Sequence, residues 1–424
     1  MFQEEFPPGA QEHSWKGRVF MKRLLAYFTA FSIFLLAGCV NNLQNSSTEP
    51  FSPPPDATID YNQFMNWSGS WTATDSGYYI LADNPGIANI YYHKYLYFMD
   101  TNCNLTPLCG RPECDHHNKD CDALIDTPGI YYHNGSLYYL YTEEMGKRGI
   151  YQMSLTGQNR HLVRKLDFLN ASDSYGIAAG KCGPYLVVTY DAPDIEEGNN
   201  RTIYLVSLDS NEPPIPIFKG VNGEEDIRYE IFKKAYPWVL ALKIEETERG
   251  HELWGYNIET QEYLLIMDNW RLNFLGDLYA SDTEIDWFTL GEGFYRLDPK
   301  TGETTKLRDA DPVVEQGAGV YDEQYIYLNN DTPGSDKTGT VPPEQHGLHI
   351  YNRDTKEIAF LSTDGIDFHL SYAFTTADRV FFYNFSTLNH IPCYYIEKDK
   401  IPTGELQWIP IEAGMEQSRP TVPN

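Results

Sequence analysis

The sequence has little positive charge and little continuous hydrophobic length. It carries 32 Lys and Arg against 60 Asp and Glu, a formal net charge of -28 over 424 residues. An acidic surplus of this size argues against the phosphate backbone of a nucleic acid, and against an anionic membrane surface, as the main partner. The apolar run at residues 24–36 is too short to cross a bilayer, which takes about 20 residues.

Amphipathic helical patterns and the common catalytic motifs are also missing. The chain has no Gly-x-Ser-x-Gly elbow, His-Glu-x-x-His pair, phosphate-binding glycine loop or repeated sialidase-type box. Aromatic residues instead make up 14% of the chain, with 32 Tyr, and they gather in short runs typical of strands. The composition therefore predicts a protein that is mostly β.

Residues 129–165 define the unit on which the rest of the chain is patterned. Two aromatic-rich runs flank Asn134-Gly135, a dipeptide that accepts the positive φ angles of a tight hairpin turn. Two more runs follow, separated by Thr156-Gly157. Four antiparallel strands of falling hydrophobicity are typical of one propeller blade.

The same plan recurs seven times, at the spacing of a repeat array. The units are residues 77–108, 129–165, 175–219, 230–267, 272–307, 317–362 and 372–411. We expect one all-β domain at residues 67–411, a β-propeller of seven four-stranded blades, with six or eight as alternatives. The count depends on the irregular fifth unit and on whether residues 66–74 add a closing strand to the last blade. The stretches 191–200 and 330–347 are predicted to be mobile surface loops.

The N-terminal region resembles a bacterial lipoprotein signal. Met21-Lys22-Arg23 is a charged start, an apolar run follows, and Leu36-Ala37-Gly38-Cys39 resembles a lipobox. This implies a signal peptide at residues 21–38 and a lipid on the thiol of Cys39, which anchors the chain to the outer face of the cytoplasmic membrane. Residues 39–66 are then a tether and residues 412–424 a tail. Residues 1–20 do not look like part of a signal, so translation is expected to start at Met21.

The densest group of reactive side chains lies between the first two predicted blades. Cys109, Cys114, His116 and Cys121 could bind a structural zinc ion with tetrahedral geometry. Disulfides among Cys103, Cys109, Cys114 and Cys121 are the alternative, because exported cysteines usually pair. We expect the site to fix the connection between the two blades.

Together these features resemble the tyrosine-rich β-propeller lipoproteins of anaerobic Gram-positive bacteria. The resemblance rests on the lipobox, the blade pattern, Pro107-Leu108-Cys109, Pro112-Glu113-Cys114, and the following His116 and Cys121. It covers nearly the whole chain, apart from the additional Cys103. It implies a propeller at the cell surface and favours the metal over the disulfides, but it assigns no activity.

Other candidates for chemistry are carboxylates. A propeller glycosidase would place acids in its central funnel, and those available are Asp191, Asp194, Glu196, Glu197, Asp282, Glu284 and Asp286. Calcium could bind at residues 309–311 or 329–336, but neither stretch has the full ligand pattern, so both are expected to be solvated turns.

We therefore expect a lipid-anchored module that binds a protein or carbohydrate ligand and has no catalysis of its own. A surface hydrolase using funnel carboxylates is the main alternative. A solute-binding lipoprotein of a transporter is weaker, because its two lobes would need alternating strands and helices.

Overall fold

The computed structural model describes residues 70–83, 93–114, 121–127, 129–142, 148–166, 179–194, 198–220, 227–245, 251–270, 278–289, 291–309, 318–330, 346–385 and 391–412. The chain divides into residues 1–52 and 53–424, and every described residue lies in the second unit. The predicted signal peptide, Cys39, the tether and residues 413–424 lie outside the described residues. In the part that is described, no helix has the length and hydropathy of a membrane span.

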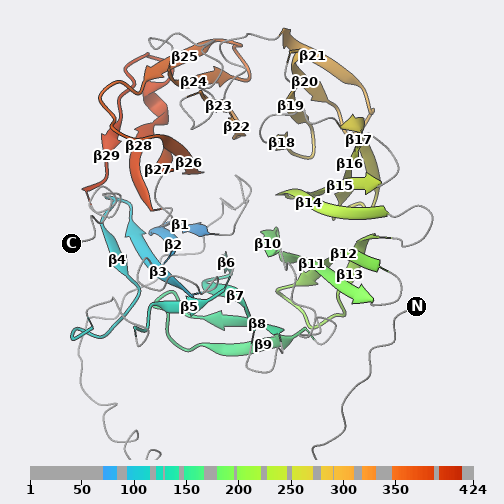
Figure 1. The fold of residues 1–424 in the computed structure, drawn as a ribbon, viewed down its shortest axis with the longest axis vertical. Coiled ribbons are helices and arrows are strands. Elements are labelled where there is room, and N and C mark those ends of the chain that lie inside the picture. Colours follow the sequence, from blue (N-terminus) through green and yellow to red (C-terminus); the bar gives the residue numbers. More distant parts are fainter. Residues whose placement is uncertain are drawn as a thin grey trace, which may run out of the picture. The chain divides into compact units, whose positions relative to one another are not determined.

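The described strands form seven antiparallel sheets, arranged as blades around a ring (Figure 1). Each blade starts with its innermost strand and ends with its outermost strand. Because neighbouring strands are antiparallel, the first-to-second and third-to-fourth turns of every blade lie on one face of the ring. This arrangement confirms the predicted seven-bladed β-propeller.

Blades 1 to 3 consist of β1 (Trp71–Thr74), β2 (Gly77–Asp83), β3 (His93–Asp100), β4 (Leu105–Pro107) and β5 (Leu124–Asp126); β6 (Ile130–His133), β7 (Ser136–Thr142), β8 (Arg148–Met153) and β9 (His161–Lys165); and β10 (Ala179–Cys182), β11 (Tyr185–Asp194), β12 (Gly198–Ser207) and β13 (Ile215–Lys219). Blades 4 and 5 consist of β14 (Ile227–Ala235), β15 (Trp238–Glu245), β16 (His251–Asn257) and β17 (Tyr263–Trp270); and β18 (Tyr279–Ala280), β19 (Ile285–Thr289), β20 (Gly293–Leu297) and β21 (Thr304–Asp309). Blades 6 and 7 consist of β22 (Ala318–Tyr321), β23 (Tyr325–Asn329), β24 (Gly347–Asn352) and β25 (Ile358–Ser362); and β26 (Leu370–Thr375), β27 (Arg379–Asn384), β28 (Pro392–Glu397), the short 3-10 helix η6 (Lys398–Lys400) and β29 (Ile409–Pro410).

The local sequence explains the hairpin of blade 2. Asn134 and Gly135 both have positive φ angles, 45° and 74°, as a two-residue hairpin turn of the favoured hand requires. The turn sets the register, so that His133 pairs with Ser136 and Ile130 with Tyr139. The predicted hairpin is confirmed.

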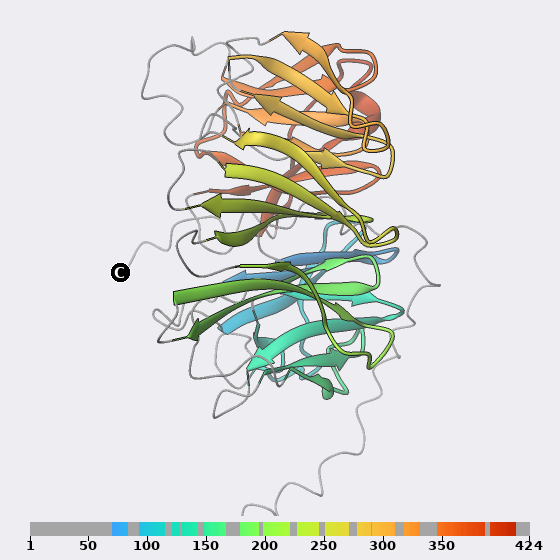
Figure 2. The ribbon, with the colours of Figure 1, turned by 90° about the vertical axis from the view of Figure 1, so that its right-hand side faces the viewer.

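The core is divided among the seven junctions between blades, each of which holds its own cluster of buried apolar side chains. The ring closes between blades 7 and 1, where Trp71 stacks on Phe374 with ring centroids 4.5 Å apart. Figure 2 shows the twisted sheets from the side, with the strands of neighbouring blades lying over one another. Sheet-on-sheet packing of this kind buries both apolar faces of every blade.

The structure answers two questions that the sequence leaves open and corrects one expectation. Residues 71–74 do not close the last blade: they form β1, which pairs with β2 inside blade 1. The irregular fifth unit is a complete four-stranded blade. The stretch 191–200 is not a loop, because β11 and β12 remain paired as far as Asp194 and Gly198. Residues 195–197 and 331–345 lie outside the described residues.

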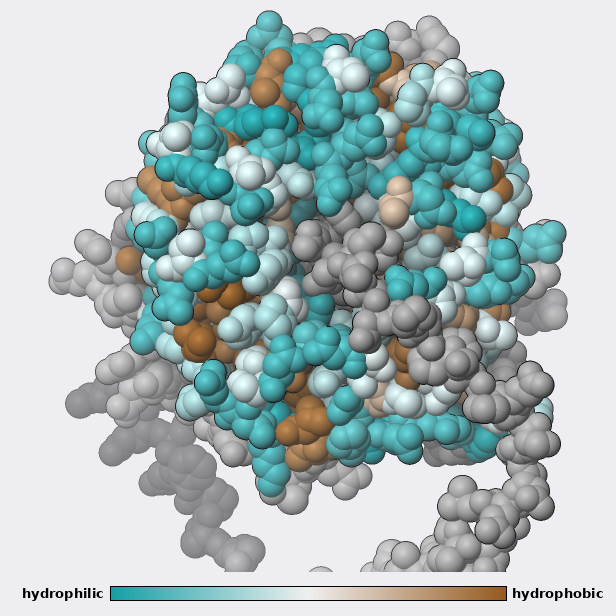
Figure 3. Space-filling view, turned by 180° about the vertical axis from the view of Figure 1, so that it is seen from behind, coloured by the Kyte–Doolittle hydropathy of each residue, from teal (hydrophilic) through white to brown (hydrophobic). Residues whose placement is uncertain are grey.

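The surface of the described part is largely polar. Figure 3 shows the face opposite to that of Figure 1, where hydrophobic residues form small separate patches among hydrophilic ones. Scattered patches of this size are normal on a soluble domain. This face therefore does not indicate a large apolar docking surface.

Candidate functional site

The cysteine cluster lies inside blade 1, on an interruption of its outer strand. β4 pairs with residues 97–99 of β3, and β5 pairs with residues 93–95 of the same strand. The two strands therefore follow one another along one edge of β3, and the chain leaves that edge after Pro107 and returns to it at Leu124. We call residues 108–123 the cysteine excursion. The sequence predicts that the cluster lies between blades 1 and 2, and this placement needs correction, because the chain returns to blade 1 before blade 2 begins.

Three thiols of the predicted site come together. The Sγ atoms of Cys109, Cys114 and Cys121 all lie within 4.8 Å of one another, and no disulfide joins the described cysteines. Sulfurs that bind one tetrahedral zinc ion at ~2.3 Å lie about 3.8 Å apart, so the cluster is close to that geometry. It is the one group in the described part of the chain whose donor atoms converge enough to hold a metal.

The remaining predicted members of this site are placed differently. His116 lies outside the described residues. Cys103 belongs to the junction of blades 7 and 1, where its Sγ atom lies 3.5 Å from the Arg379 guanidinium. Burial raises the pKa of the Cys103 thiol, although Arg379 opposes that shift.

Two of the clustered thiols, Cys109 and Cys121, differ in their tendency to ionise. Burial disfavours the Cys109 thiolate, but hydrogen bonds from the Arg111 and Asp122 backbone outweigh burial and lower the pKa of this thiol. Burial raises the pKa of the Cys121 thiol to about 12. Arg111 also pairs with the Asp122 carboxylate, its Nε atom lying 3.0 Å from Oδ2. Cys109 therefore ionises more readily than Cys121.

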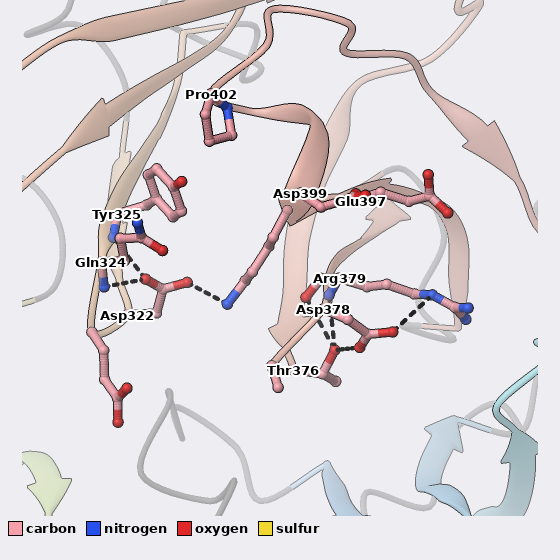
Figure 4. A pocket seen from close by; sticks show the side chains of 12 residues that line it. Asp322, Gln324, Tyr325, Thr376, Asp378, Arg379, Glu397, Asp399 and Pro402 are labelled. Atoms are coloured by element: carbon pink, nitrogen blue, oxygen red, sulfur yellow. Dashed lines mark hydrogen bonds and ion pairs between the residues drawn. The ribbon is translucent and has the colours of Figure 1, made fainter.

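A second site, which the sequence does not predict, lies between blades 6 and 7 on the face of the first-to-second turns. A cavity of about 730 Å³ is bounded by the turn 322–325, the turn 376–379 and η6 with its flanking residues. Figure 4 shows Asp322 and Tyr325 on one wall and Thr376 and Asp378 on the other. Pockets of roughly 300 to 1,000 Å³ are the usual size for small ligands.

A buried ion pair forms the floor of this pocket. Lys398 Nζ lies 2.6 Å from Asp322 Oδ2, and the Tyr327 hydroxyl donates to the same oxygen at 2.7 Å. The other oxygen of Asp322 accepts the backbone N–H groups of Gln324 and Tyr325. The floor is therefore rigid, and the carboxylate of Asp322 is fully engaged.

The charges that remain around the pocket are mainly negative. The lining includes five carboxylates, Asp322, Glu323, Asp378, Glu397 and Asp399, but only two basic groups, Lys398 and Arg379. Lys398 pairs with Asp322, and Arg379 lies 3.5 Å from the Asp378 carboxylate while it donates to the Thr101 carbonyl of blade 1 at 2.7 Å. Lys400, next to the pocket, lies 3.6 Å from the exposed Asp399 carboxylate. A ligand entering this pocket meets an excess of negative charge.

Two of the acids suggested for catalysis converge, but on arginines. Arg296 lies 2.7 Å from both Glu284 and Asp286, and the buried Arg353 reaches Asp286 at 2.8 Å and also Glu284. Hydrogen bonding to Asp286 raises the pKa of Arg296. Burial opposes the charge of Arg353, yet Asp286 and Glu284 outweigh it and raise the pKa of this guanidinium too. We call Glu284, Asp286, Arg296 and Arg353 the arginine cluster; it joins blades 5 and 6.

The other suggested residues show no converging chemistry. Asp282 lies in an exposed turn. The side chains of Asp191 and Asp194, and all of Glu196 and Glu197, lie outside the described residues. Of the calcium candidates, Asp309 pairs with Lys306 at 2.7 Å, and the Asn329 amide donates to the Leu370 carbonyl.

No protein-family model matches the chain, and no curated protein sequence matches it. Among solved structures it is similar to an oligogalacturonate lyase in complex with manganese, at 11% identity, 72% of this chain, 82% of that chain and a TM-score of 0.44. It is also similar to a puromycin hydrolase, at 12% identity, with 85% of this chain and 57% of that chain covered and a TM-score of 0.49. For the acylaminoacyl peptidase of Pyrococcus horikoshii the identity is 10%, the coverage is 73% of this chain and 48% of that chain, and the TM-score is 0.40. The chain spans about half the length of these two hydrolases. Similarities at this level carry no argument about activity or substrate.

Proposed function

We propose that the chain is a binding module, anchored at the cell surface through a lipid on Cys39, and that the pocket between blades 6 and 7 is its ligand site. The observation that carries the binding role is the pocket itself, a cavity of about 730 Å³ on a floor held by the Asp322–Lys398 pair. A floor that is already ordered lowers the entropic cost of binding. The membrane anchor rests on the lipobox alone.

The proposed ligand group is a primary ammonium, carried by a saccharide or by a protein segment. Glu323 and Asp399 come from opposite sides of the pocket, one from the turn of blade 6 and the other from η6. The net charge of -28 also favours the approach of cationic ligands from a distance. Hydroxyl groups on a saccharide could bond to Thr376 and Gln324, which also line the cavity.

A binding role is favoured over hydrolysis by the state of Glu284 and Asp286. A glycosidase needs one carboxyl group that can donate a proton and a second that is free to attack or to activate water. In the arginine cluster both carboxylates are neutralised by guanidinium groups, and Asp286 is only 2% exposed. The transporter alternative lacks support because the described sheets are all antiparallel blades.

For the cysteine cluster we propose zinc as the ion, with His116 as the fourth ligand. Thiolate and imidazole ligands suit Zn²⁺, and four protein ligands are typical of a structural site. In such a site the ion would add stability and would leave no open position for a substrate.

Calorimetric titration of the full chain tests the ligand site. We expect binding of a glucosamine tetramer, which carries free amines, and of a lysine-rich peptide, but not of the N-acetylated tetramer. The variant Glu323→Gln/Asp399→Asn should bind at least about tenfold more weakly, which is a loss of ~1.4 kcal/mol in binding free energy. The control Glu303→Gln/Glu357→Gln removes two exposed carboxylates from the outer turns of blades 5 and 6 and should bind normally. Equal losses in both variants would contradict the assignment of the pocket.

A further inference from the structure

The cysteine excursion is pinched at its base around one residue. The Leu96 backbone N–H donates to the Ala123 carbonyl at 2.9 Å, and its carbonyl accepts the Leu108 N–H at 2.8 Å. Leu96 is fully buried in β3. The two ends of the excursion are therefore held side by side at one edge of β3, by the N–H and the carbonyl of the same residue.

The strands on either side of this pinch are short. β4 and β5 have three residues each, whereas strands in globular proteins usually have about five or six. Each makes few ladder hydrogen bonds with β3, so neither is expected to stay paired without further support. The outer edge of blade 1 needs an additional link.

The three thiols are placed to supply that link. Cys109 directly follows the exit at Leu108, Cys121 precedes the return at Ala123, and Cys114 comes from the excursion itself. The Cys121 sulfur also accepts the Ala123 N–H at 3.4 Å, which ties it to the returning strand. We propose that one zinc ion, bound by Cys109, Cys114 and Cys121, joins β4 and β5 into a single outer strand of blade 1. This inference rests on the zinc ion proposed above and assigns its role.

The returning end of the excursion also contacts blade 2. Arg160, in the turn between β8 and β9, donates to the carbonyls of Asp122 and Leu124. Both acceptors lie within three residues of Cys121. The zinc ion therefore also holds the two carbonyls that Arg160 needs, and its loss loosens the junction of blades 1 and 2.

The test combines metal analysis with amide hydrogen exchange on the full chain. We expect about one zinc per chain, and loss of most of it in Cys114→Ser. Cys114 is the ligand chosen because it is half-buried, whereas Cys121 lies in the core. The matched control is Cys103→Ser, which changes a cysteine of the same blade outside the cluster and should keep the metal.

Exchange should separate the proposed role from simple metal binding. Removal of zinc by a chelator, or by Cys114→Ser, should speed amide exchange in β5 at least about tenfold and leave β13 and β21 unchanged. Disulfides among the clustered cysteines with no metal would overturn the proposal, and so would bound zinc whose removal leaves β5 protected. Titration of the same samples with the glucosamine tetramer keeps the two ideas apart, because the pocket lies between blades 6 and 7 and its binding should survive loss of zinc.

Discussion

Arg353→Met should destabilise the protein strongly, because it removes the centre of the arginine cluster. The Arg353 side chain is 1% exposed and bonds to Asp286, to Glu284 and to the carbonyls of Asp322 and Glu323. Its guanidinium also lies 3.7 Å from the centroid of the Tyr279 ring. Methionine fills much of the same volume but leaves one buried carbonyl, one partly buried carbonyl and part of a buried carboxylate without donors.

The size of the loss in stability depends on which ion pairs are left after the substitution. Breaking a buried ion pair costs about 3–5 kcal/mol when one charge is left behind. Arg296 still pairs with Asp286 after the change, so we expect the lower end, about 3 kcal/mol, as a loss in the free energy of unfolding. Equilibrium urea denaturation measures it, with Arg228→Met as control, since Arg228 forms an exposed, loose pair with Glu230 at 3.9 Å.

A double-mutant cycle that combines Arg353→Met with Asp286→Asn then isolates the interaction energy between these two residues. Groups in direct contact within one network show coupling energies of about 0.5–3 kcal/mol, and we expect the upper part of that range here. A loss below ~1 kcal/mol for Arg353→Met, or additive effects in the cycle, would refute the view that this cluster holds blades 5 and 6 together.

Three further predictions follow from single residues. Burial lowers the pKa of Lys234 to about 8, so this lysine destabilises the fold at a pH where it is protonated in both the folded and the unfolded state. Between pH 8 and ~10.4 the unfolded chain binds more protons than the folded one, so the stability of the native protein should rise with pH. Lys234→Met should therefore be more stable than the native protein by up to about 3 kcal/mol at pH 7, with no difference above pH ~10.4, and a less stable variant at pH 7 in thermal unfolding would contradict this. Gly77→Ala should lower the melting temperature by several degrees, because φ is 149° and a Cβ atom would lie 2.3 Å from the Met99 carbonyl oxygen; an unchanged melting temperature would show that β2 can shift. Cys39→Ser should release the chain into the medium or leave an uncleaved precursor in cell fractionation, and normal processing with retention on membranes would end the lipoprotein interpretation.

Much of the ring can be predicted from local sequence, because each hairpin is encoded by neighbouring residues. Asn134-Gly135 predicts its turn since both residues tolerate positive φ. The acidic stretch after Asp191 misleads for a physical reason: main-chain pairing can extend a hairpin past the apolar core, and polarity alone does not end a strand. Trp71 to Thr74 gives too short a pattern to choose between two blades.

The positions of the sites depend on contacts that cannot be deduced from the spacing of residues along the sequence. The cysteine cluster is predictable because its members lie close together along the chain, but its position inside the outer strand of blade 1 follows only from the pairing of β4 and β5 with β3. Asp322 and Lys398 belong to different blades, and the closed ring brings them to 2.6 Å. The same applies to Asp286 and Arg353. One local signal was available: Asp322 opens a first-to-second turn and accepts two backbone N–H groups, as turn-forming Asp residues commonly do.

A crystal structure of the full chain soaked with the glucosamine tetramer tests the binding role most directly. We expect a sugar ring between the turn 322–325 and η6, with its ammonium within hydrogen-bond distance of Glu323 or Asp399 and Lys398 still paired with Asp322. A saccharide bound elsewhere on the ring, with the pocket between blades 6 and 7 empty, would contradict it.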